Sequence, residues 1–243
     1  MAAMDGHIRW LDYHLQRLQL GCERLDLPPP DWQALRREIA DYCPEHGRSV
    51  VKLIVTRGAG ARGYRPDESA QPSRILSISP WPGCPPANYT DGISVRTMQL
   101  RLGENPALAG IKHLCRLEQV LAQLELRAGD AQEGLLLGSS GFVVGGISSN
   151  VFLLRGSELV TPDLARCGVS GVMRRATLEF APQLGLTVIE RDVTPEEVQQ
   201  ADEVFMTNAL FGIWPVAMLD QHAFRRGPKT RELMKSLGYG PDA

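Results

Sequence analysis

The chain of 243 residues lacks any apolar run approaching the roughly 20 residues that cross a bilayer. Its first residues, Met-Ala-Ala-Met-Asp-Gly-His, lack the apolar core of a signal peptide. There is no internal repeat and no low-complexity segment. Lysine and arginine together (26) do not outnumber aspartate and glutamate (28), so no basic excess indicates a polyanionic partner. We expect a globular protein that binds neither nucleic acid nor membrane.

The chain also lacks the cysteine spacing of a disulfide framework or a zinc site. The number of cysteines is odd (five), and no two of them have CxxC spacing. No Walker loop, serine elbow or HExxH metal motif occurs. We therefore expect a reducing, cytoplasmic setting and no metal.

Lysine itself is scarce, since only four of the 26 basic residues are lysine. One of them, Lys112, stands in the apolar run Gly110–Glu118, just before an amphipathic helix. An arginine there would stay charged, whereas an ammonium group can lose its proton. A lysine in this setting is suited to forming a Schiff base.

A core of full size fits this length, either as one large domain or as two sharing an interface. The sequence predicts an α+β fold with a small lobe over residues 1–80, a Pro- and Gly-rich linker over 81–92, and a larger lobe over 93–243. Predicted helices cover residues 11–27, 30–42, 116–127 and 171–185, and predicted strands cover 49–56, 74–79, 93–99, 135–137, 142–144, 151–154, 158–161, 186–191 and 203–207. The pair Asp5-Gly6 predicts a hairpin, and Thr194-x-x-Glu197 predicts a capping box opening a short helix.

Two segments carry residues suited to binding anions. The loop from Arg57 to Pro66 places Arg57, Arg62 and Tyr64 directly after a buried strand, which suits recognition of a carboxylate. An arginine-rich surface turn is an equally good interpretation. The run Gly168–Arg174 is a glycine-bounded turn that feeds a helix, whose free amides attract phosphate.

Other residues near these segments have simpler interpretations. Thr207-Asn208-Ala209 could add polar contacts to a phosphate, although ordinary turn and capping chemistry explains both this segment and Gly168–Arg174 as well. His113 could act as an acid or base, but a lone histidine is more often a packed structural residue. The apolar residues Leu117, Val120, Leu121 and Leu124 are predicted to belong to the core.

Six segments in order carry a family resemblance, and together they cover nearly the whole chain. They are RGAGARGY (57–64), LAGIKHLCRLEQ (108–119), SNVF (149–152), TP (161–162), GVSGVMR (168–174), and ADE (201–203) with NAL (208–210). These segments resemble the fold-type IV pyridoxal-phosphate enzymes, a group of branched-chain aminotransferases, D-amino acid aminotransferases and aminodeoxychorismate lyases. They are most similar to the lyases. The resemblance implies a small α/β N-terminal lobe, a larger pseudo-barrel C-terminal lobe and a cytoplasmic homodimer.

The resemblance also implies roles for individual residues. Lys112 would form the internal aldimine with pyridoxal 5'-phosphate (PLP). The cofactor phosphate would be held by Arg17 and by the backbone amides of Val172 and Met173, near Asn208 and Ala209. In the small lobe, Arg57, Arg62 and Tyr64 would bind the dicarboxylate substrate.

The implied reaction converts 4-amino-4-deoxychorismate to 4-aminobenzoate and pyruvate, as in folate biosynthesis. The freed amine of Lys112 would take a proton from the ring carbon bearing nitrogen, and enolpyruvate would leave. Electron flow into the cofactor ring would stabilise the carbanion.

The sequence departs from the family pattern at two places. The acidic residue that pairs with the pyridine nitrogen normally stands five positions before the asparagine, where this chain has Gly145. Family members usually have about 25 to 30 further residues at the front, which this sequence does not show. Either the start of the chain is misassigned, or the first lobe is truly shortened, in which case its sheet would have an unpaired edge.

Two other functions compete with the lyase. One is a branched-chain or D-amino acid aminotransferase on the same fold, against which the run His113-Leu114-x-Arg116 argues. The other is a truncated, non-catalytic homologue, which Gly145 and the short front would favour and which Lys112 and Arg17 oppose.

Overall fold

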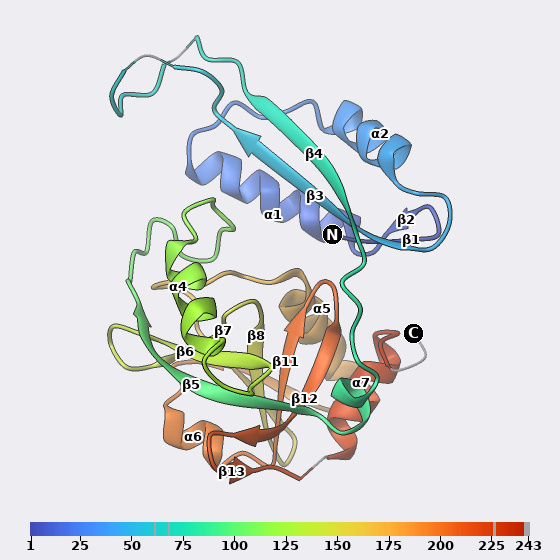
Figure 1. The fold of residues 1–243 in the computed structure, drawn as a ribbon, viewed down its shortest axis with the longest axis vertical. Helices are drawn as coiled ribbons and strands as arrows, with labels where there is room; N and C mark the ends of the chain where they lie inside the picture. Colours follow the sequence, from blue (N-terminus) through green and yellow to red (C-terminus); the bar gives the residue numbers. More distant parts are fainter. Residues whose placement is uncertain (61, 68, 226, 241–243) are drawn as a thin grey trace. The chain divides into compact units, whose positions relative to one another are not determined.

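A computed structural model describes residues 1–60, 62–67, 69–225 and 227–240 of the chain (Figure 1). The chain divides into two compact units, Met1–Gly83 and Cys84–Ala243, which we call unit 1 and unit 2. Each unit has its own sheet and its own hydrophobic clusters.

Unit 1 is built on a four-stranded sheet with the order β2-β1-β3-β4. The strands are β1 (Ala2–Met4), β2 (His7–Ile8), β3 (Arg48–Thr56) and β4 (Ser73–Pro80). The predicted hairpin at Asp5-Gly6 is confirmed, because both residues have positive φ (47° and 78°) and join β1 to β2. Helices α1 (Leu11–Arg24) and α2 (Trp32–Tyr42) cover this sheet, and they bury their apolar residues against β3 and β4. β2 and β4 are the edges of the sheet, and the shortening at the front stays a prediction.

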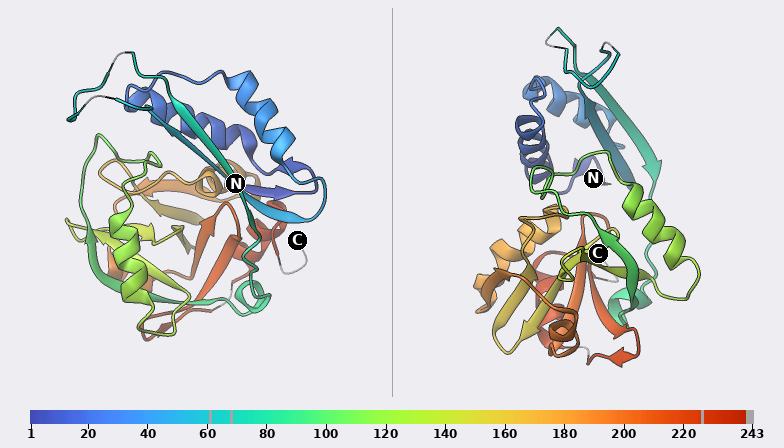
Figure 2. Two further views of the ribbon diagram at one scale, coloured as in Figure 1. Left: turned by 45° about the horizontal axis from the view of Figure 1, so that its top comes forward. Right: turned by 90° about the vertical axis from the view of Figure 1, so that its left-hand side faces the viewer.

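Unit 2 is built on a larger sheet with the order β10-β9-β8-β11-β12-β5-β6-β7. Its strands are β5 (Ile93–Leu102), β6 (Glu133–Gly138), β7 (Val143–Gly146), β8 (Asn150–Arg155), β9 (Glu158–Pro162), β10 (Thr187–Arg191), β11 (Glu203–Asn208) and β12 (Gly212–Leu219), with β13 (His222–Ala223) beside β12. One hydrophobic cluster draws residues from β5 through β9, β11 and β12, and β7 packs against β8 and β9. The sheet is therefore curled around its core, as the predicted pseudo-barrel requires (Figure 2).

The helices of unit 2 pack outside this curled sheet. They are α3 (Ala87–Thr90), α4 (Leu117–Leu126), α5 (Val172–Phe180) with the 3-10 turn η1 (Ala181–Leu184), α6 (Pro195–Gln199) and α7 (Pro228–Ser236). α5 and α7 pack on β11 and on each other, whereas α4 packs on β5 and β6. The capping box at Thr194 and Glu197 is confirmed, with both of its reciprocal hydrogen bonds formed.

One prediction about unit 2 is wrong. Leu117, Val120, Leu121 and Leu124 of α4 are exposed, and the helix buries Ala122 and Leu126 instead. The sequence shows that one side of this helix is apolar, but it does not show which side faces the sheet. Within the described ranges, no helix is long and apolar enough to cross a membrane.

Candidate functional site

Lys112 lies in the loop between β5 and α4, and its side chain is exposed. The loop is held by a parallel bridge between Gly110 and Val169. The Gly110 amide donates to the Gly168 carbonyl at 3.1 Å, and the Ser170 amide donates to the Gly110 carbonyl at 2.9 Å. The backbone just before Lys112 is thereby fixed to the turn that opens α5.

Glycine is needed on both sides of this bridge. Gly110 and Gly168 have φ of 80° and 92°, a conformation that other residues rarely adopt. A β-carbon on Gly168 would also lie 2.7 Å from Cγ1 of Val144. Both positions therefore favour glycine for their backbone conformation, and Gly168 also for the space that the Val144 side chain occupies.

Arg116 holds the same loop from its other end. Its guanidinium donates to the carbonyl oxygens of Ile111 and His113, each at 3.1 Å. These two residues flank Lys112 in the chain. Burial lowers the pKa of Arg116, and the side chain also brings a positive charge close to Lys112. Sequence analysis included Arg116 in a motif but did not predict this role.

His113 is partly buried beside Lys112 in the loop. Burial, followed by the charge of Arg116, lowers the pKa of its imidazole, which favours the neutral form near pH 7. Its Nδ1 atom is buried and has no hydrogen-bond partner among the described residues. These features fit the packed structural histidine that sequence analysis favoured.

The start of α5 offers open backbone amides. Its N-cap is Gly171, which has no side chain to cap the helix, so the amides of Val172 and Met173 find no partner within it. A β-carbon on Gly171 would overlap Oδ1 of Asn150. Asn150 is fixed in turn, because its Nδ2 donates to the carbonyl of Val169 at 2.9 Å. An anion would meet free N–H groups and the positive end of the helix dipole here.

Thr207 adds a hydroxyl group on the same face of the sheet. It pairs with Asn150 across β8 and β11, and cross-strand partners point to the same side. Its Oγ1 atom is buried and lacks a hydrogen-bond partner in the part of the chain that is described. A buried hydroxyl without a partner is costly, and an anion bound at the start of α5 could supply the missing partner.

Asn208 and Ala209 form the turn after β11. Oδ1 of Asn208 accepts hydrogen bonds from the amides of Leu210 and Phe211, each at 2.9 Å, so this oxygen serves the turn itself. Nδ2 of Asn208 donates to the carbonyl of Ser148 at 3.4 Å. The cofactor-binding role of Asn208 and Ala209 stays a prediction.

A buried carboxylate organises the turn between β7 and β8. Glu133 accepts hydrogen bonds from the amides of Gly134 and Ile147 at 3.0 and 3.1 Å, and from the hydroxyl groups of Ser148 and Ser149 at 2.8 and 3.1 Å. Sequence analysis missed this residue, because three of these four donors stand 14 to 16 positions later in the chain. The turn that leads into Asn150 is rigid for this reason.

Gly145 lies in β7 at the edge of that turn. A β-carbon there would lie 2.9 Å from the backbone oxygen of Ser149. The family's acidic residue therefore cannot be restored by Gly145→Glu without moving the turn. The backbone around position 145 therefore leaves no room for a carboxylate side chain.

Four of the predicted site residues belong to unit 1. Arg17 lies in α1 and is half-buried. Arg57 donates to the carbonyl of Leu25 at 2.6 Å, and Arg62 and Tyr64 are exposed in the loop after β3. The other predicted site residues belong to unit 2, where Lys112 lies in the loop before α4, Val172 and Met173 at the start of α5, and Asn208 and Ala209 at the turn after β11.

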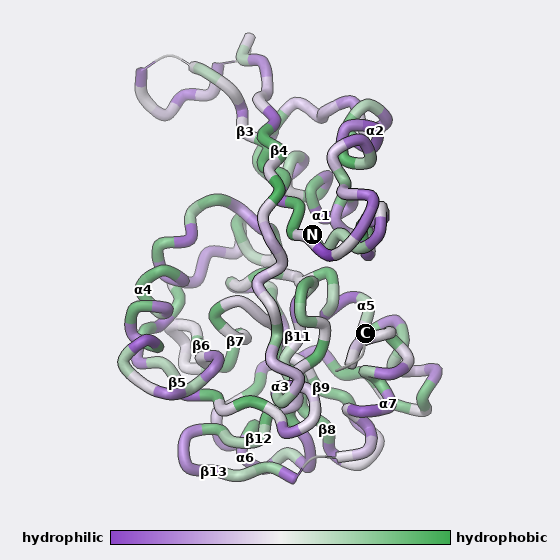
Figure 3. Tube along the Cα trace, turned by 45° about the vertical axis from the view of Figure 1, so that its right-hand side comes forward, coloured by the Kyte–Doolittle hydropathy of each residue, from purple (hydrophilic) through white to green (hydrophobic). Residues whose placement is uncertain are grey.

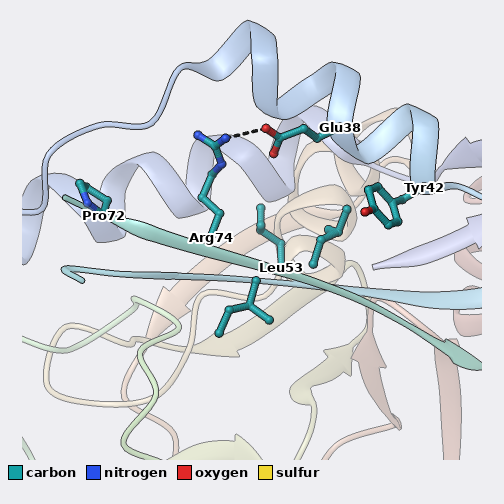
Figure 4. Close-up of a pocket in the computed structure, with 7 residues that line it drawn as sticks. Glu38, Tyr42, Leu53, Pro72 and Arg74 are labelled. Carbon is teal, nitrogen blue, oxygen red and sulfur yellow. Dashed lines mark hydrogen bonds and ion pairs between the residues drawn. The ribbon is translucent and has the colours of Figure 1, made fainter. Parts of the chain in front are cut away.

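Unit 1 also contains an open hollow of about 700 Å³ between α2 and the strands β3 and β4 (Figure 4). An ion pair between Arg74 and Glu38, at 2.5 Å, crosses it. None of the predicted site residues lines this hollow. Among the described residues, no group of three or more His, Cys, Asp or Glu could hold a metal ion. The loop of Lys112 and the start of α5 remain the candidate site.

Comparison with known proteins identifies the class of this fold and site. The model of the aminotransferase class IV family matches residues 1–219, and the chain belongs to that family. A crystal structure of 4-amino-4-deoxychorismate lyase from Pseudomonas aeruginosa is 47% identical, with a TM-score of 0.92, covering 98% of this chain and 87% of that one. Aminodeoxychorismate lyase from Vibrio harveyi is 31% identical over 96% of this chain and 87% of its own length.

More distant structures share the fold. A hypothetical aminotransferase from Mycobacterium tuberculosis, solved in a PLP-bound form, is 20% identical with a TM-score of 0.85, and it covers 98% of this chain and 85% of its own. The predicted two-lobed fold-type IV architecture is confirmed.

Proposed function

We propose that this protein is a PLP-dependent aminodeoxychorismate lyase, which converts 4-amino-4-deoxychorismate to 4-aminobenzoate and pyruvate. The observation that carries the proposal is the backbone bridge between Gly110 and Val169. It holds a lysine beside a helix start with open amides, and an aldehyde cofactor that bears a phosphate needs both groups.

The residues of unit 2 fit that cofactor. The amides of Val172 and Met173 and the hydroxyl group of Thr207 would hold its phosphate, next to Asn208 and Ala209. The family resemblance adds Arg17 to these phosphate ligands. The amine of Lys112 would bind the aldehyde carbon. When bound, PLP supplies an electron sink next to the substrate amine.

In this proposal, the protein's own groups move the protons. The amine of Lys112 would take the proton from the ring carbon that bears nitrogen. The bond between the ring and the enolpyruvyl oxygen would then break, and the ring would become aromatic. The protonated Lys112 would give its proton to the departing enolpyruvate, which becomes pyruvate. Arg57, Arg62 and Tyr64 would bind the two carboxylates of the substrate.

Gly145 weakens one part of this arrangement. Unless another group or a water molecule takes the place of that acid, the ring would be a poorer electron sink. The gain of aromaticity makes a weaker sink tolerable for a lyase, whereas a transaminase would suffer more. The identities of 47% and 31% to proteins named as lyases also favour this reaction over transamination.

The proposal includes a cytoplasmic homodimer that takes part in folate biosynthesis. All five cysteines are free thiols, which fits a reducing compartment.

Removing the amine of Lys112 tests the proposal. Lys112→Ala should abolish the visible absorption band that PLP gives with the wild-type protein and the mass increase that follows borohydride reduction. Formation of 4-aminobenzoate, followed by its fluorescence with a coupled synthase, should fall by roughly 10³-fold or more. Lys52→Ala, an exposed lysine in β3, is the matched control and should change neither readout.

Each competing function predicts a different result. Transfer of the amino group to a 2-oxo acid without release of 4-aminobenzoate would identify an aminotransferase. A wild-type protein that shows no band with PLP would instead be a non-catalytic homologue.

A further inference from the structure

Glu133 opens β6 with a carboxylate that is almost fully buried, since only 2% of the residue is exposed. β6 pairs with β7, and the two strands lie side by side in unit 2 (Figure 3). In the described part of the chain, the hydrogen-bond donors to Glu133 are amides and hydroxyl groups, and none of them is charged. Burying a carboxylate costs more than burying an apolar side chain. The presence of Glu133 is therefore explained by what its hydrogen bonds hold in place.

The two carboxylate oxygens of Glu133 have different donors. Oε1 accepts from the amides of Gly134 and Ile147, at 3.0 and 3.1 Å. Oε2 accepts from the hydroxyl groups of Ser148 and Ser149, at 2.8 and 3.1 Å. The amide of Ser148 also donates to Oε2, at a longer distance of 3.4 Å. One side chain therefore fixes three consecutive residues of the turn between β7 and β8.

Gly146 leaves the room that this arrangement needs. A β-carbon at this position would lie 2.0 Å from Oγ of Ser149 and 3.2 Å from Cδ of Glu133. A larger residue would therefore push the hydroxyl group of Ser149 away from the carboxylate. The amide of Gly146 also donates to the carbonyl of Ser149 at 2.8 Å, which closes the turn through the backbone. The sequence of the turn is thus matched to the buried carboxylate.

The turn leads directly into Asn150, whose side chain contacts the segment that opens α5 at two points. Its Nδ2 donates to the carbonyl of Val169 at 2.9 Å, and a β-carbon on Gly171 would lie 2.1 Å from its Oδ1. Val169 in turn forms the bridge to Gly110. A displacement of the turn would therefore reach both the bridge and the open amides of α5.

The turn also contacts the end of β11. The hydroxyl group of Ser149 lies 3.5 Å from Sδ of Met206, and the carbonyl of Ser148 accepts from Nδ2 of Asn208 at 3.4 Å. Thr207, with its buried hydroxyl group, stands between Met206 and Asn208 in the strand. The turn therefore contacts β11 on either side of Thr207.

We propose that Glu133 is a positioning residue for the candidate site. By fixing the turn over residues 147–149, it sets where Asn150 and Thr207 stand beside the start of α5. Glu133 acts through the turn, because its own oxygens are occupied by the donors described above. The cofactor held at this site is that of the proposed function, on which this inference rests.

Glutamine at position 133 separates the effect of position from that of charge. Its carbonyl oxygen can accept from the two amides, and its NH₂ group can donate to the two hydroxyl groups, which then act as acceptors. Only the contact from the amide of Ser148, at 3.4 Å, would be lost. Glu133→Gln should therefore raise the Kd of PLP by less than about 3-fold. Glu133→Asp is one carbon shorter and cannot reach both sets of donors, so it should raise this Kd by about 10-fold or more.

Glu203→Asp is the matched control. Glu203 is 7% exposed, and its carboxylate accepts from the amide and the hydroxyl group of Thr230, at 2.8 and 2.6 Å, at the start of α7. Its shortening should lower stability in urea unfolding, as that of Glu133 should, but leave the Kd of PLP unchanged in a spectroscopic titration. Equal Kd values in the two aspartate variants would overturn the proposal. A Glu133→Gln variant as weak as Glu133→Asp would also overturn it, because charge instead of position would then matter.

A change in the turn itself covers the case in which Glu133→Asp does not fold. Ser148→Ala combined with Ser149→Ala removes both hydroxyl donors and keeps the carboxylate. This double variant should raise the Kd of PLP by about 10-fold as well. A Kd equal to that of the wild-type protein would contradict the role given to the turn.

A measurement without cofactor separates this inference from the proposed function. Hydrogen exchange, followed by NMR, would report on the amides of Gly110 and Ser170, which donate the hydrogen bonds of the bridge. Both amides should exchange about 10-fold faster in Glu133→Asp, and at the wild-type rate in Glu133→Gln and Glu203→Asp. Unchanged exchange in Glu133→Asp would refute the inference even if the wild-type protein made 4-aminobenzoate. A wild-type protein that binds no PLP would refute the proposed function, and the exchange rates would still decide the role of Glu133.

Discussion

Two helices of unit 2 begin beside the loop of Lys112, and they begin in opposite ways. α4 starts at Arg116, whose guanidinium reaches back to the carbonyls around Lys112. α5 starts at Gly171, which contributes no side chain and leaves the first amides open. The arginine at the start of α4 adds a positive charge and holds the loop of Lys112 by hydrogen bonds. The glycine at the start of α5 leaves room for an anion.

The two helices also differ in which side chains they turn towards the sheet. α5 buries Val172, Met173, Ala176 and Thr177 against the sheet. α4 is tied to β5 through carboxylates and keeps most of its large apolar residues outside. The difference teaches that an apolar row alone does not decide how a helix is oriented, because a few hydrogen bonds from carboxylates to strand amides can outweigh it.

The largest effect should come from filling the open start of α5. In Gly171→Ala, the new methyl group displaces Asn150 and breaks its bond to Val169. We expect a loss of about 1–3 kcal/mol in stability and a similar loss in PLP affinity, which is roughly 10- to 100-fold in Kd. Urea unfolding and a spectroscopic PLP titration would measure these effects.

Gly21→Ala is the control for that substitution. Gly21 lies in α1 with no atom near its missing β-carbon, so alanine should stabilise the protein by up to about 1 kcal/mol and leave PLP affinity unchanged. Equal PLP affinity in the two variants would contradict the role given to the start of α5.

The next largest effect should come from the hydrogen bonds that Arg116 donates at the start of α4. Arg116→Lys keeps a positive charge but cannot donate to both Ile111 and His113 in the same geometry. Because Lys112 would be held less firmly, kcat should fall by about 10-fold. Arg96→Lys removes a comparable bond, from Arg96 to the carbonyl of Glu125, and should leave kcat unchanged. A similar fall in both variants would show that Arg116 has no special role.

A smaller effect is expected at Thr207. Thr207→Val removes a buried hydroxyl that lacks a partner among the described residues, so stability should not fall, but PLP Kd should rise about 5- to 10-fold. Thr177→Val is matched, because Thr177 has a similarly buried and unpaired hydroxyl in the middle of α5. Titrations would compare the two variants, and an unchanged Kd in Thr207→Val would exclude its hydroxyl from the phosphate site.

The smallest effect concerns Cys167, in the segment that leads to α5. Burial, followed by the charge of Glu104, raises the pKa of its thiol to about 11. At pH 8 only about one molecule in a thousand would therefore carry the reactive thiolate. Labelling of Cys167 in the folded protein should be slow at pH 8 and accelerate up to about pH 11, as peptide mapping would show. If Cys167 in the folded protein were labelled at pH 8 as fast as in the urea-unfolded chain, its thiol pKa would not be raised.

Local signals in the sequence predicted local structure well. The hairpin at Asp5-Gly6 and the capping box at Thr194 and Glu197 both formed, because each depends on neighbours in the chain. β12 was not predicted, since Pro215 within it argues against a strand inside a sheet. The side that α4 turns to the sheet could not be predicted, because the amides that hold it, in β5 and just after it, stand 15 or more residues earlier in the chain.

The candidate site was predicted only in part, for the same reason. Lys112 and the glycine-bounded start of α5 could be recognised from their own surroundings. Thr207 and Glu133 acquire their roles from contacts across the fold. Arg116 contacts residues only three and five positions earlier, but the bend of the loop that brings their carbonyls to its guanidinium is not visible in the sequence. A glutamate at the start of a strand gives no sign in the sequence that it will be buried and satisfied by a distant turn.

The bridge between Gly110 and Val169 has a consequence for how this site tolerates mutation. Its hydrogen bonds run from backbone to backbone. The distance between the loop of Lys112 and the start of α5 therefore does not depend on the side chains at positions 169 and 170. Those two positions can change without disturbing the register of the catalytic groups. The two glycines cannot, since their φ values exclude most other residues. In a saturation-mutagenesis map, Gly110 and Gly168 would appear as fixed positions, and the two positions after Gly168 would appear as permissive ones.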